Sequence, residues 1–71
     1  MDESRMLFER RGKYYRVESE RTESTFIVHR TDIATGRVAR SISVAMERLG
    51  KRETARTLVA RHGYRYIGSD N

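Results

Sequence analysis

Hydrophobic and polar residues alternate with a period of two through the middle of the chain. Residues 13–18 place Tyr15 and Val17 on one side, and residues 25–30 are rich in β-branched and aromatic residues. Residues 37–46 alternate again, with apolar side chains at most of the even positions. Since successive side chains of a strand point to opposite faces, the pattern predicts three strands with one face on a core. Their short connections favour an antiparallel arrangement.

The period changes to about 3.6 after Gly50, which predicts a helix over residues 51–62. Its apolar stripe, at spacing i, i+3, i+4 and i+7, consists of Ala55, Leu58, Val59 and His62. We therefore expect His62 to be partly buried and Gly63 to end the helix. Residues 64–67 alternate once more, which is typical of either a short fourth strand or an aromatic tail that packs over the sheet.

These elements predict an α+β fold in which a three-stranded antiparallel sheet packs on one C-terminal helix, in the order β-β-β-α. A chain of 71 residues makes one small domain. We expect residues 1–12 and 68–71 to be flexible, although the apolar triplet at residues 6–8 could cap the core instead. Such a short chain buries only about 60% of its unfolded surface, which leaves little core on which to build a catalytic cleft.

One helix covers one face of a sheet, so we expect the other face to be free. The side facing the helix is predicted to carry Tyr15, Val17, Phe26, Val28, Val38, Ile42 and Val44. The free side is predicted to combine arginine and small hydroxyl side chains with few acids, through Tyr14, Arg16, Thr25, Ile27, His29, Arg37, Ala39, Ser41 and Ser43. Strict alternation would point Arg40 at the core, so a sheet edge or a β-bulge is expected there, with either a phosphate contact or a plain surface role.

The basic charge is unevenly distributed. The formal net charge is +5, and thirteen of the fifteen basic residues are arginine. Residues 1–23 carry no net charge, so the whole excess lies in residues 24–71. A basic region of this kind is typical of a protein that binds a polyanion, and the arginine fork can grip a phosphate or a guanine edge through two hydrogen bonds. Arginine richness on an ordinary solvated surface is the alternative.

The chain carries no residue pattern that indicates catalysis or a bound cofactor. There is no cysteine, and two histidines alone give no zinc signature. Neither a phosphate-binding P-loop nor a G-x-S-x-G motif occurs, so we predict no enzyme, no cofactor and no metal. The longest apolar run is three residues and the N-terminus is acidic, which predicts a cytoplasmic protein without a membrane span or a signal peptide.

Several short motifs resemble the AP2/ERF-type DNA-binding domain. They are Thr35-Gly36, Ser41-Ile42-Ser43-Val44, Leu49-Gly50, and Glu53 with Ala55, within residues 13–62. The chain looks most similar to the bacterial and phage members and to the arm-binding domains of tyrosine integrases. Tyr15 stands where the family often has tryptophan. The resemblance implies three antiparallel strands on a C-terminal helix, a sheet inserted in the DNA major groove, and contacts from Arg16, His29, Arg37, Ser41 and Ser43.

We therefore predict a small DNA-binding protein that acts in transcription regulation or as an accessory to DNA recombination, with double-stranded DNA as its partner. The candidate nucleic-acid-binding residues are Tyr14, Arg16, His29, Arg37, Arg40, Ser41 and Ser43. Two alternatives remain open. Tyr14 could stack on the bases of a single-stranded RNA. Ile27 beside Tyr14 could instead mark a protein-interaction module that forms a homodimer or docks on a partner through the uncovered sheet.

Overall fold

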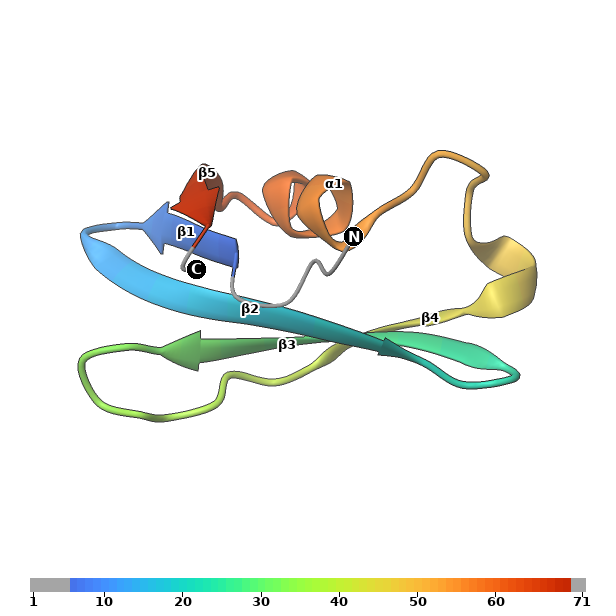
Figure 1. Cartoon of the computed structure of the whole chain (residues 1–71), viewed down its shortest axis with the longest axis horizontal. Helices are drawn as coiled ribbons and strands as arrows, with labels where there is room; N and C mark the ends of the chain where they lie inside the picture. Colours follow the sequence, from blue (N-terminus) through green and yellow to red (C-terminus); the bar gives the residue numbers. More distant parts are fainter. Residues whose placement is uncertain (1–5, 70–71) are drawn as a thin grey trace.

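The computed structural model describes residues 6–69, so the flexibility expected for residues 1–5 and 70–71 lies outside the described part. Within the described range, five strands form one sheet, and a single α-helix packs on it (Figure 1). The elements are β1 (Met6–Arg10), β2 (Lys13–Arg21), β3 (Thr25–Asp32), β4 (Ile42–Ala45), the 3₁₀ turn η1 (Met46–Arg48), α1 (Ala55–Arg61) and β5 (Arg65–Ser69). The strand order is β4-β3-β2-β1-β5, and every neighbouring pair is antiparallel.

The predicted α+β fold with an antiparallel sheet and one helix is confirmed, but the sheet has five strands rather than three. Residues 6–12 and 68–69, for which flexibility is expected, include regular structure: β1 pairs along its length with β2, and β5 extends to Ser69. A two-residue turn joins β1 to β2, with Arg11 at φ 52° and Gly12 at φ 80°. Positive φ at both positions matches the twist of the flanking strands, so this turn sets the hairpin register.

The segment predicted as a strand over residues 37–46 is a strand only at Ile42–Ala45. Thr31 pairs with Val38, whereas Val28 pairs with Ile42. Between these two pairs β3 advances by three residues, whereas the segment opposite it advances by four. The additional residue forms a bulge around Arg40, where either a bulge or a sheet edge is expected. The extra residue reverses the alternation, so Val38 shares a face with Thr31 and is 62% exposed. Its predicted place in the core is wrong.

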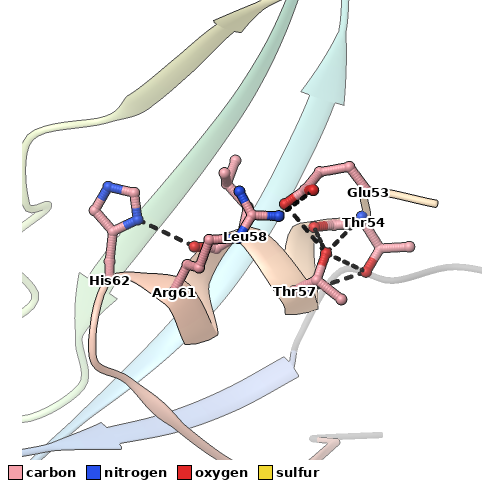
Figure 2. A network of polar contacts seen from close by, with 6 residues as sticks. All are labelled: Glu53, Thr54, Thr57, Leu58, Arg61 and His62. Atoms are coloured by element: carbon pink, nitrogen blue, oxygen red, sulfur yellow. Dashed lines mark hydrogen bonds and ion pairs between the residues drawn. The ribbon is translucent and has the colours of Figure 1, made fainter. Parts of the chain in front are cut away.

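The helix α1 is shorter than predicted because its N-terminal cap is Thr54. The Thr54 hydroxyl accepts from the Thr57 amide at 3.2 Å, and the Thr57 hydroxyl accepts from the Thr54 amide at 2.9 Å (Figure 2). This reciprocal pair satisfies two amides that the first turn leaves free. At the other end His62 is exposed rather than partly buried, and its Nδ1 donates to the Leu58 carbonyl at 3.0 Å.

The core lies between α1 and one face of the sheet, and that face is called the helix side below (Figure 1). The buried side chains come from three strands, the helix and the segment after it: Met6, Phe8, Val17, Phe26, Val28, Ala55, Leu58, Val59 and Tyr64. Tyr15, Ile42 and Val44 pack against them, so the predicted core face is confirmed apart from Val38. Within residues 6–69, no helix has the length and apolar character that crossing a membrane requires.

Candidate nucleic-acid interface

The sheet face opposite α1, called the bare face below, is close to neutral. Alternation places three carboxylates on it, from Glu9, Glu18 and Glu20. The Glu20 carboxylate lies 2.9 Å from His29 Nε2, and Glu9 accepts from Arg65 Nε at 3.2 Å. The expectation of few acids on this face is wrong. The unforeseen strand β1 adds Glu9, and β2 continues far enough to add Glu20. Glu18 already lies in the predicted strand, in phase with Tyr14 and Arg16.

Five of the seven predicted site residues gather on the bare face. Tyr14, Arg16, His29 and Ser43 point there by alternation along β2, β3 and β4. Ser41 joins them, because its hydroxyl lies 2.8 Å from His29 Nδ1. Tyr14 is 51% exposed and could make contacts outside the chain. His29 is already held between a serine and a glutamate, and these two contacts engage both of its ring nitrogens.

The other two predicted site residues, Arg37 and Arg40, are separated from this group by the bulge. Asp32 donates its amide to the Arg37 carbonyl at 2.8 Å, which sets Arg37 opposite Asp32 and so on the helix side. The free-face position predicted for Arg37 is therefore wrong, and so is that of Ala39, which lies opposite Arg30. Arg40 is exposed, and its backbone carbonyl accepts a hydrogen bond from the Arg30 guanidinium.

The basic side chains concentrate on the helix side instead. Arg10 is in phase with Met6 and Phe8 along β1, and Arg30 is in phase with Phe26 and Val28 along β3. Lys13 lies opposite Arg10 in the β1–β2 pair and shares its face. Asp32 shares the helix side at this end of the sheet, and its carboxylate accepts from the Ala34 amide at 2.9 Å and from the Thr35 amide at 3.4 Å.

Four arginine side chains on the helix side have their guanidinium groups placed over aromatic rings. Arg10 and Arg30 lie over the Tyr64 ring, at 5.1 and 5.2 Å from its centroid. The distances from Arg21 to the Phe26 centroid and from Arg56 to the Tyr66 centroid are 4.7 and 3.8 Å. Such cation–π contacts orient an arginine without neutralising its charge. We call these four residues the helix-side arginine surface: Arg10, Arg21, Arg30 and Arg56.

Further basic residues border this surface. Arg48, Lys51 and Arg52 are exposed in the segment before α1. Arg61 lies on α1 and forms an ion pair with Glu53, as Figure 2 shows. Among residues 6–69, the four members of the helix-side arginine surface have no carboxylate partner.

Part of this arrangement could have been found from the sequence. Phe26, Val28 and Arg30 alternate in one strand, so Arg30 belongs to the core-facing series by the same rule that places Val28 there. Arg10 carries no comparable signal until residues 6–10 are known to form a strand. Tyr64, which joins these two arginines, follows the helix and gives no local indication of its neighbours.

Comparison of the chain with models of protein families, with characterised proteins and with solved structures finds no match. The resemblance to AP2/ERF-type domains stays a prediction.

Proposed function

We propose that the chain binds double-stranded DNA, and that it does so through the helix-side arginine surface. The observation that carries the proposal is the set of four guanidinium groups held over aromatic rings without a carboxylate partner among residues 6–69. An ordered, uncompensated group of arginines suits a phosphate backbone, because each positive charge that meets a phosphate releases condensed counterions. Arg10, Arg21 and Arg56 reach solvent, whereas Arg30 is only 9% exposed and adds its charge from beneath the surface. Binding of this kind positions the protein on a duplex whatever the base sequence is.

The charge distribution favours this side over the bare face, on which the AP2-like mode of docking depends. Glu9, Glu18 and Glu20 would point at the phosphates if the bare face entered a groove. Like charges brought together in this way oppose binding. The bare face combines paired charges with the apolar side chains of Leu7, Tyr14 and Ile27, a composition suited to protein contact. A protein-interaction module is therefore the second candidate.

A pair of matched double variants tests which face binds. Arg21→Ala with Arg56→Ala removes two charges from the helix side, while Arg16→Ala with Arg65→Ala removes two from the bare face. Duplex affinity is measured by fluorescence anisotropy over a range of salt concentrations, and circular dichroism checks the fold. For four to six neutralised phosphates, log K falls with log[salt] at a slope of about −4 to −5.

The helix-side variant should bind more weakly, with a slope less steep by about 2, because each lost phosphate contact removes about 0.9 from it. The bare-face variant should keep the slope of the unmodified protein. If the bare-face variant instead loses affinity and has the less steep slope, while the helix-side variant keeps both, the chain binds DNA through the bare face. No measurable duplex binding by the unmodified protein at low salt would favour the protein-interaction module.

A further inference from the structure

Two positively charged side chains meet at one tyrosine hydroxyl. Arg30 Nη1 donates to Tyr64 Oη at 2.7 Å, and Arg10 Nη1 donates to the same oxygen at 3.4 Å. The two arginines come from β3 and β1, which are separated in the sheet by β2. Tyr64 is 5% exposed, and its ring forms an edge-to-face pair with the Tyr15 ring, with the centroids 5.1 Å apart. The geometry is thus fixed by the core.

This arrangement leaves two like charges close together. Arg30 is only 9% exposed, and none of the carboxylates in residues 6–69 pairs with it or with Arg10. A buried charge is costly unless it is paired, and a second cation beside it raises the cost. An anion that touches both guanidinium groups would remove this cost.

The three side chains also have hydrogen-bond donors to spare. Arg30 uses one donor on Tyr64 and one on the Arg40 carbonyl, and its Nε is buried without a partner. Arg10 is half-buried, so its remaining donors can be reached from solvent. The Tyr64 oxygen accepts from both arginines, and no acceptor among residues 6–69 takes the hydroxyl proton. The Nη1 groups of Arg10 and Arg30 and the Tyr64 hydroxyl, which come from three different segments, therefore meet at one place.

We propose that Arg10, Arg30 and Tyr64 form a binding site for a single phosphate monoester or inorganic phosphate. A phosphate monoester carries a charge of about −1.5 to −2 near neutral pH, which matches two guanidinium groups. Its three terminal oxygens can accept from the three donor groups, whereas a carboxylate offers only two oxygens. The site goes beyond the proposed duplex binding, because one small phosphate compound is enough to occupy it.

Inorganic phosphate is the probe in the first experiment. Sodium phosphate and sodium chloride at equal ionic strength are titrated into the ¹⁵N-labelled protein, and the Tyr64 amide and the arginine Nε–Hε signals are followed by NMR. Saturable shifts of the Arg10, Arg30 and Tyr64 signals are expected with phosphate and not with chloride. A dissociation constant in the millimolar range would correspond to a few charge-assisted hydrogen bonds partly offset by desolvation.

Arg10→Met is the test variant, because the half-buried Arg10 can be replaced by a side chain that still covers the Tyr64 ring. Losing one charge-assisted donor should weaken phosphate binding about tenfold or more. Arg56→Met is the matched control, since it removes an arginine from the ring of Tyr66 while leaving this site intact. Dispersed NMR spectra of both variants check that they fold.

Equal shifts with phosphate and chloride, or equal weakening in both variants, would overturn the site. To identify the natural ligand of the site, binding affinities are compared for a 5′-phosphorylated oligonucleotide, the same oligonucleotide without the phosphate, and a nucleoside monophosphate. Tighter binding of the phosphorylated strand than of the monophosphate indicates a strand end, and equal binding indicates a small phosphate compound. Since inorganic phosphate is tested without nucleic acid, the site can stand or fall independently of duplex binding.

Discussion

Tyr64→Phe removes a single oxygen atom from the core and should destabilise the protein measurably. The ring keeps its edge contact with Tyr15 and its place under Arg10 and Arg30, so the apolar packing is unchanged. What disappears is the 2.7 Å hydrogen bond from the nearly buried Arg30 guanidinium, together with the longer one from Arg10. Arg30 would then keep only the Arg40 carbonyl of its two acceptors in residues 6–69, with Nη1 unsatisfied in addition to Nε.

A hydrogen bond to a charged group contributes about 1.5–3 kcal/mol, and leaving a buried donor unsatisfied costs a similar amount. We expect a loss of about 2 kcal/mol in the free energy of unfolding. A domain of this length has a total of about 4–11 kcal/mol, so the loss is a large fraction of it. At about 4–8 °C per kcal/mol, the melting temperature should fall by about 8–16 °C.

Urea unfolding followed by circular dichroism measures this loss, and Tyr66→Phe is the matched control. The Tyr66 hydroxyl lies 3.2 Å from the exposed Ser69 hydroxyl, and its ring contacts with Phe8 and Arg56 would remain. The control should change the free energy of unfolding by less than about 0.5 kcal/mol, as an exposed site allows. If Tyr64→Phe changes it as little, the buried Arg30 does not depend on the tyrosine oxygen and the reasoning fails.

Two further substitutions test the packing and the helix start. Val28→Ala deletes two methyl groups from a fully buried position, and should cost about 2–3 kcal/mol in urea unfolding. A cost below about 1 kcal/mol would mean that the sheet and α1 close over the gap. Thr54→Ala removes the N-terminal cap of α1, and should cost about 1 kcal/mol and reduce the helical circular dichroism signal. If the midpoint of urea unfolding does not change, packing against the sheet is sufficient to hold the helix in place without the cap.

Local sequence patterns were sufficient to predict those elements whose buried face is set by the spacing of their own apolar side chains. The alternation along residues 13–18 and 25–30 predicted β2 and β3 and the side that each turns to the core. The helical stripe predicted the buried face of α1, although the capping threonines set a later start. The site residues on these strands could be assigned to a face for the same reason.

The first strand could not be assigned from the sequence because its partners are distant. Residues 6–10 contain only one apolar triplet, and they form a strand by pairing with β2 on one side and with β5 on the other. The turn that allows the first pairing places Arg11 at positive φ, a conformation that arginine seldom adopts. β1 then brings Glu9 to the bare face and Arg10 to the helix side.

By itself the sequence determined which residues share a face within a strand or a helix, because the period of the backbone fixes that locally. Tertiary structure alone decided which strands neighbour one another. The alternation indicated a sheet edge or a bulge at Arg40, but only the pairing showed that the residues before it exchange faces. The pairing of β1 carried Arg10 to Tyr64, and the bulge near Arg40 moved Arg37 away from the bare face. The position of the positive charge follows from these long-range pairings, which no local period records.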